Sequence, residues 1–199
     1  MKKELPYFKI ENSYGGNQDW FRDPMMKLGG CAAATACDVS IYMALYQDKT
    51  HLYPFDISNL NKGDYISFSA KMKPYLSPRW SGINTLDIYI EGVKQYLMDS
   101  GEASLQLSGF SGDRPLEEAA AQIRKQIGNK MPIPYLLLKH KSPNIKFFVW
   151  HWFLLVGYEE YDDGFFVKAA TYGSYHWLSL RELWDTGYSE KGGMILLGE

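Results

Sequence analysis

The sequence predicts an α+β fold, with helices in the N-terminal part of the chain and a mostly antiparallel sheet in the C-terminal part. Two observations carry this prediction. Alanine-rich or amphipathic segments that suit helices occupy much of the chain before Gly128, and short apolar runs separated by turn residues follow it. The 199 residues, 46% of them hydrophobic, are enough for one packed core, so we expect residues 1–199 to form a single domain.

The helical part begins with an alanine run, Ala32-Ala33-Ala34, which favours a helix from residue 31 to about residue 46. An apolar stripe along it indicates one face packed on a core. Residues 54–78 contain three prolines and predict an irregular segment with a short helix near residues 58–60. The elements expected next are a helix that opens at 82–87 and stops at Gly101, a strand at 104–107, and a helix from 114 to 128.

Three apolar runs, residues 133–139, 147–158 and 165–170, predict an antiparallel meander. The Asp162-Asp163-Gly164 segment is typical of a tight hairpin turn between the last two. The middle run is apolar on both faces, which indicates a central, buried strand. A strand at 173–177, a short helix at 180–184 and a strand at 194–197 complete the expected elements.

Cys31 is the first candidate functional residue, because it follows Gly29-Gly30 at the start of the alanine-rich helix. Unpaired N–H groups at a helix N-terminus favour thiolate over thiol, so we expect a lowered pKa for Cys31. The alternative is a small buried residue in a tight turn. Cys37 falls on the apolar stripe and is expected to be a buried hydrophobic residue. With both cysteines on one helix, a disulfide between them is not expected.

His151 is the second candidate, at the start of the buried run Trp152-Phe153-Leu154-Leu155. The neighbouring indoles of Trp150 and Trp152 are expected to shield the imidazole from water. A thiol and an imidazole are the pair that nucleophilic acyl transfer requires, provided that the fold brings them together.

Three segments together resemble the papain-like cysteine peptidase superfamily, nearest to bacterial peptidases that cut double-glycine leaders. They are the Gly-Gly-Cys helix start at Cys31, the Gly-Ile-Asn-Thr-Leu helix start at 82–86, and the strand that opens with His151. The resemblance implies a papain-like fold, with Cys31 as nucleophile and His151 as general base and acid. It also implies an oxyanion-binding amide upstream, for which Gln18 is the first choice and Asn17 the second. The alternative for these two is a polar turn before Trp20.

The chain departs from this family where an Asn or Asp orients the histidine, because Ala170 stands at that position. The Thr171 hydroxyl is available but would orient the ring less well, and His176 is near enough in sequence to approach the site. Three functions remain open: a thiol hydrolase or acyl transferase acting on a peptide or small amide, a degenerate module that binds a peptide or protein, and a structural protein with Cys31 buried.

Other function classes are not expected. The 21 basic and 23 acidic residues form no basic run, which argues against nucleic acid or an anionic membrane as partner. His51, His140 and His176 have no metal-ligand spacing, so we predict no metal or other cofactor and assign these histidines surface or hydrogen-bonded roles. The N-terminus shows no signal-peptide pattern, which predicts a cytoplasmic protein.

Overall fold

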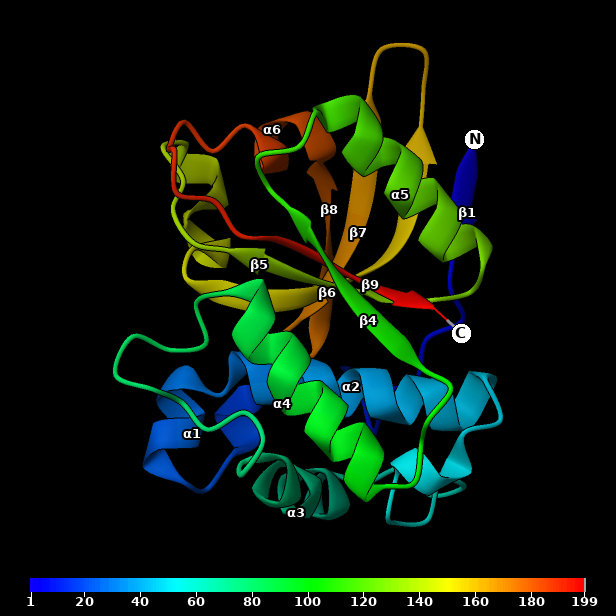
Figure 1. Ribbon diagram of the computed structural model, residues 1–199. Coiled ribbons are helices and arrows are strands. Elements are labelled where there is room, and N and C mark those ends of the chain that lie inside the picture. The colour runs from blue at the N-terminus through cyan, green and yellow to red at the C-terminus, as the bar shows by residue number, and fades with distance from the viewer. Residues whose placement is uncertain (199) are drawn as a thin grey trace.

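The computed structural model describes residues 1–198 and shows a seven-stranded sheet with helices on both faces (Figure 1). The strands of this sheet are β1 (Lys2–Glu4), β4 (Gln106–Ser111), β5 (Ile133–Leu137), β6 (His151–Glu160), β7 (Phe165–Thr171), β8 (Ser174–Ser179) and β9 (Gly193–Gly198), while β2 (Lys9–Ile10) and β3 (Ser13–Tyr14) pair in a separate two-stranded sheet. The α-helices are α1 (Pro24–Gly29), α2 (Cys31–Tyr46), α3 (Lys62–Met72), α4 (Leu86–Asp99), α5 (Leu116–Gly128) and α6 (Leu180–Trp184). Short 3-10 helices are η1 (Gln18–Trp20), η2 (Thr50–Leu52) and η3 (Pro143–Phe148).

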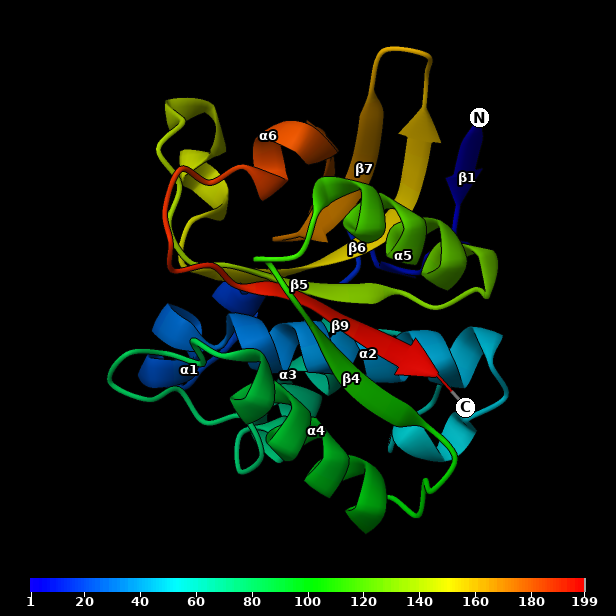
Figure 2. The same cartoon turned by 45° about the horizontal axis from the view of Figure 1, so that its top comes forward.

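The sheet runs in the order β4-β9-β5-β6-β7-β8, and neighbouring strands are antiparallel. β1 pairs with β6 beyond the end of β5, so it continues the same row of the sheet. The helices α1 to α4 lie on one side of the sheet, and α5 and α6 lie on the other. Both views, Figures 1 and 2, show this arrangement. The α+β class with a mostly antiparallel sheet is therefore confirmed.

Helix α2 is the central helix of the molecule. It spans the predicted residues and packs against β6 on one side and against α3 and η2 on others. The sequence predicted that one face of this helix is buried. The buried surface is wider than that, because almost every residue from Ala32 to Ala44 is buried. Small side chains in its first turns, including Ala33 and Ala36, allow the close approach to the sheet.

Two helices on the α2 side of the sheet were not predicted. α1 begins at Pro24 after Asp23, whose carboxylate accepts a hydrogen bond from the Met26 N–H. In the segment expected to be irregular, Asn61 caps α3 by accepting from the Asp64 N–H. The short helix expected at 58–60 is absent among the described residues, and the prediction for this stretch is wrong because capping, not proline content, decides where the helix lies.

Two predicted strand starts are also wrong. The Glu102 carboxylate accepts hydrogen bonds from the N–H groups of Ser104 and Leu105. These bonds fold residues 102–105 into a turn, so β4 begins at Gln106 and not at residue 104. Similarly, Ser142 caps η3, so residues 147–148 belong to that 3-10 helix and β6 begins at His151. The β5-β6-β7 meander and α6 are confirmed.

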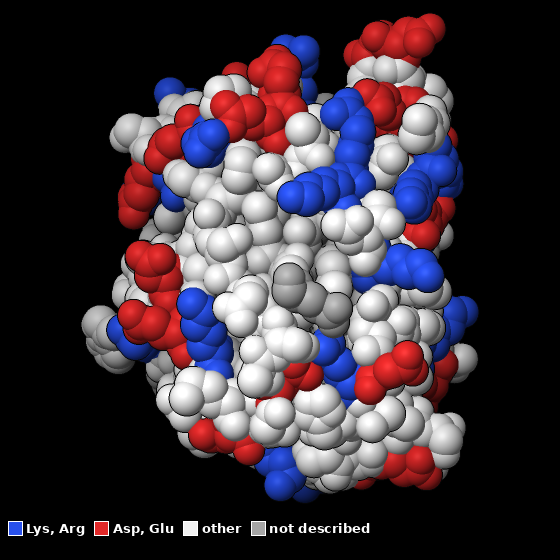
Figure 3. Space-filling view, turned by 45° about the vertical axis from the view of Figure 1, so that its right-hand side comes forward, with Lys and Arg blue, Asp and Glu red and all other residues white. Residues whose placement is uncertain are grey.

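The face of the molecule that carries β1 and α5 has a surface of mixed charge. In Figure 3, basic and acidic side chains alternate around an uncharged area, and the described residues on this face form no continuous basic patch. Among residues 1–198, no helix combines the length and the apolar character needed to cross a bilayer.

Candidate functional site

The imidazole of His151 is buried at the first position of β6, with 5% of the residue exposed. Its Nε2 lies 2.6 Å from Oγ1 of Thr171, the last residue of the neighbouring strand β7. The site therefore has a hydroxyl partner for the histidine. Ala170, where the family pattern has an Asn or Asp, is a buried residue in the adjoining wall.

The ring of Tyr172 covers the imidazole. The two rings are stacked, with centroids 4.7 Å apart and planes only 6° from parallel. Tyr172 and Gly173 both have positive φ, 49° and 72°, and this left-handed turn after β7 directs the phenol over the histidine. A hydrogen-bonding group at one edge and a ring on one face together fix the orientation of His151.

The two indoles next to His151 in the chain, Trp150 and Trp152, have different surroundings. Trp152 donates its indole N–H to the Ile83 carbonyl at 2.6 Å and stacks on Tyr89. Trp150 has a positive φ of 54° and is half exposed. Both indoles line the cavity beside the imidazole, and the ring stacked on it is that of Tyr172.

Cys31 is the first residue of α2 and is partly buried, whereas Cys37 is fully buried. Both are free thiols. Backbone N–H groups, those of Trp152 and Ala32 among them, favour the thiolate of Cys31, but burial outweighs them and raises its pKa. The lowered pKa expected for Cys31 is therefore wrong for the resting site: the helix N-terminus is present, yet its effect is smaller than the cost of removing the thiolate from water.

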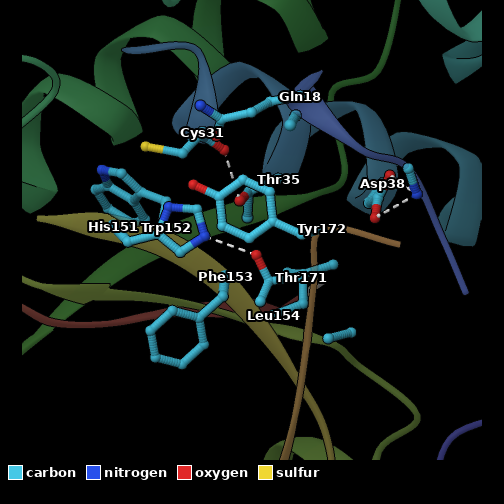
Figure 4. A pocket seen from close by; sticks show the side chains of 13 residues that line it. Gln18, Cys31, Thr35, Asp38, His151, Trp152, Phe153, Leu154, Thr171 and Tyr172 are labelled. Carbon is cyan, nitrogen blue, oxygen red and sulfur yellow. Dashed lines mark hydrogen bonds between the residues drawn. The ribbon is translucent and has the colours of Figure 1, made fainter. Parts of the chain in front are cut away.

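Cys31 and His151 line the same cavity, which has a volume of about 230 Å³ and is also lined by Gln18 and Tyr172. The imidazole has one nitrogen, Nε2, that faces Thr171. In Figure 4 the Cys31 sulfur lies on the side of the other nitrogen, Nδ1. The structure thus brings together the thiol, the imidazole and the first-choice amide from three separate segments of the chain.

Gln18 and Asn17 have different positions. The Gln18 side chain is buried, and its Nε2 donates one hydrogen bond to the Lys27 carbonyl at 3.1 Å. The second N–H of this amide has no hydrogen-bond partner among the described residues. Asn17, the second choice, instead accepts from the Asp19 N–H and donates to the Tyr172 carbonyl at 3.2 Å. Asn17 therefore connects two loops.

The other histidines lie outside this site. His176 packs on Phe147 and Phe148, so it does not orient His151. His51 contacts Glu102, and His140 bonds the Glu182 carbonyl. Within the described part of the chain, no group of three or more His, Cys, Asp or Glu side chains is placed to hold a metal ion.

Burial makes the resting pair neutral. It lowers the pKa of His151 to about 4 and raises that of Cys31, and it raises the pKa of Tyr172 to about 12. At neutral pH the pair is thus a thiol and an uncharged imidazole. In the tautomer that carries its proton on Nε2, the ring donates a hydrogen bond to Thr171 and Nδ1 holds the lone pair.

Comparison with protein-family models, with curated proteins and with solved structures found no match to this chain.

The different burial of the two thiols predicts selective alkylation. Iodoacetamide should modify Cys31 and leave Cys37 unmodified in the folded protein, and the rate at Cys31 should climb with pH well above 7 because its pKa is raised. Peptide mapping by mass spectrometry across pH 6–10 measures this, with Cys31→Ser as control. Rapid modification of Cys31 at pH 6.5 would contradict the raised pKa.

The neutral His151 predicts a pH-dependent stability. Because its folded-state pKa of about 4 lies below the unfolded value, the unfolded chain binds the proton first, so stability is lost as pH falls from 6.5 to 4. The loss from this residue is about 3 kcal/mol. Denaturant unfolding at several pH values should show the wild type losing this amount relative to His151→Gln. The exposed-histidine variant His176→Gln should keep the wild-type slope; an equal slope in all three proteins would refute the assignment.

Proposed function

We propose that the protein is a cysteine peptidase-type thiol hydrolase or acyl transferase that acts on a peptide or small amide. The observation that carries this proposal is the shared cavity, in which Cys31 at a helix N-terminus and an oriented His151 meet. The resemblance to papain-like peptidases supports the same assignment. The proposed roles are nucleophile for Cys31, general base and acid for His151, and oxyanion donor for Gln18.

In the proposed reaction, the Cys31 sulfur attacks the carbonyl carbon while its proton passes to Nδ1 of His151. The developing oxyanion is stabilised by the Gln18 amide and by backbone N–H groups at the start of α2. The imidazolium then gives the proton to the departing amine as the C–N bond breaks, which leaves a thioester on Cys31. Water or another amine, deprotonated by His151, attacks the thioester and releases the thiol.

Thr171 and Tyr172 hold the base through these steps. In the proposed active tautomer, the Nε2–H group donates a hydrogen bond to the Thr171 hydroxyl, and Nδ1 carries the free lone pair. Tyr172 keeps the ring plane fixed by stacking. Because both charged forms of the pair are disfavoured by burial, proton transfer is expected to accompany attack on the substrate and not to precede it.

The cavity favours an uncharged substrate group. Its lining includes Leu28, Ile83, Leu136 and Trp150 and contains no Lys, Arg, Asp or Glu. Leu28 is 82% exposed, so apolar surface continues from the cavity to its rim. A charged side chain placed here would lose hydration without gaining a partner. The acyl group recognised next to the scissile bond is therefore apolar.

A degenerate binding module is the second candidate. It is favoured by the raised pKa of Cys31 and by a histidine whose partner is a hydroxyl instead of a carboxylate. Such a module would hold a peptide in the same cavity without forming a thioester.

The catalytic roles are tested with a matched pair at Thr171. Thr171→Val removes the hydroxyl at nearly constant shape and should lower kcat by roughly 100-fold, short of the ~10⁴-fold loss seen when a triad carboxylate is replaced. Thr171→Ser keeps the hydroxyl and should retain most activity. Cys31→Ala should be inactive. Equal activity of the Val and Ser variants would contradict the role of Thr171.

Substrate class is tested with amide and thioester libraries that differ in the acyl side chain. Apolar acyl groups should be turned over at least about tenfold faster than charged ones, because the latter lose hydration in the cavity. Mass spectrometry should detect an acyl group on Cys31 and none on Cys31→Ala. Tight binding of peptides without any acyl-enzyme or turnover would support the binding module instead.

A further inference from the structure

Asp38 is a buried acid that the proposed reaction does not use. It lies on α2 about two turns beyond Cys31. Its carboxylate accepts hydrogen bonds from the Tyr7 hydroxyl at 2.9 Å and the Tyr65 hydroxyl at 2.8 Å. The Gly16 N–H lies 3.1 and 3.2 Å from its two oxygens. Four close contacts of this kind hold a carboxylate firmly in one orientation.

The contact to Gly16 requires the absence of a side chain. A Cβ at this position would lie 1.9 Å from the ring and hydroxyl atoms of Tyr65. Gly16 therefore lies directly against Tyr65, and its backbone is fixed to α2 through Asp38. Residues 16–18 continue from this fixed point into the cavity that contains Cys31.

The same loop also holds the turn after β7. The Gly16 carbonyl accepts from the Gly173 N–H at 3.1 Å, and the Asn17 side chain donates to the Tyr172 carbonyl at 3.2 Å. A further backbone bond of 2.8 Å joins the Tyr14 N–H to the Gly173 carbonyl. The segment from Tyr14 to Asn17 thus connects α2 to the residues that cover His151.

We propose that Asp38 is a positioning residue for the Cys31–His151 site, acting through Gly16 on Gln18 and on the Tyr172 ring. The positioning is indirect. Asp38 and His151 line opposite parts of a small cavity of about 20 Å³ and share no hydrogen bond, as Figure 4 shows. The inference rests on the proposed site, but its main test does not require hydrolysis.

Charge on Asp38 matters for this role. A carboxylate accepts at both oxygens, whereas a carboxylic acid must donate from one of them and loses acceptor capacity. The ionisable groups that face it, Tyr7, Tyr65, Tyr89 and Cys37, are uncharged near neutral pH. Burial raises the pKa of Asp38 to about 6, so the loop is held by a carboxylate above this pH.

The test replaces Asp38 with Asn and follows the pKa of His151 by NMR of labelled histidine. If Asp38 holds Tyr172 over the imidazole, then Asp38→Asn lets water reach the ring, and the His151 pKa should rise by one unit or more toward its ordinary value. Glu102→Gln is the matched control, because Glu102 is equally buried and accepts three hydrogen bonds near Ser104, away from this loop. It should leave the His151 pKa unchanged.

Asn17→Ala provides a second, milder variant, which removes the side-chain link from the loop to Tyr172 together with the bond that Asn17 accepts from the Asp19 N–H. It should raise the His151 pKa in the same direction, and combining it with Asp38→Asn should add little, because both changes act on one connection. An unchanged His151 pKa in folded Asp38→Asn overturns the proposal. If that variant does not fold, an unchanged value in Asn17→Ala does so.

Kinetics separate this proposal from the proposed function. With an active protein, Asp38→Asn should lower kcat by tenfold or more with less than a threefold change in KM, and the acid limb of the kcat profile near pH 6 should disappear. If no variant or wild type hydrolyses any substrate but the His151 pKa still shifts, the positioning role stands and the hydrolase assignment fails. If Asp38→Asn leaves the His151 pKa unshifted and turnover is normal, the hydrolase assignment stands and the positioning role fails.

Discussion

The contact between α2 and β6 is the constraint on which the rest of the structure depends. The helix starts at Cys31 and the strand starts at His151, so packing one element on the other places their first residues at the same end of the interface. Small residues in the first turns of α2 make the approach close. The short side chain of Cys31 and the ring of His151 can therefore share one cavity. Their backbone positions are held by the packed core beneath them.

That rigidity has an electrostatic cost. The core that fixes the thiol and imidazole also removes water from both, which disfavours their charged forms. Polar groups are placed to offset this: a hydroxyl at the far edge of His151, backbone N–H groups at the helix start, and the Gln18 amide. At rest the site therefore holds a neutral thiol and imidazole and not an ion pair.

Local sequence signals predicted the elements that carry the two main residues. The alanine run predicted α2, and the apolar segment after His151 predicted a central strand. The position of β9 between β4 and β5, and of β1 beside β6, depends on pairing between residues distant in the chain, which no local pattern encodes. The partner of His151 could not be decided from the sequence for the same reason: the family pattern pointed to Ala170, and Thr171 was only the weaker alternative, whereas the structure places the Thr171 hydroxyl against the imidazole. Asp38 did have a signal, a lone acid within an otherwise uncharged helix, but its meaning required knowing that the helix is buried all round.

The beginning of α2 has one more consequence. Gly30 occupies the N-cap position, and no side chain caps the helix there. Ser, Thr, Asp and Asn are the side chains that cap this end of a helix, and a glycine in their place leaves a helix less stable by a few tenths of a kcal/mol. A carbonyl oxygen seated beside Cys31 would supply the acceptor that the chain omits. A bound acceptor at this position would thus complete the first turn of the longest helix in the described chain.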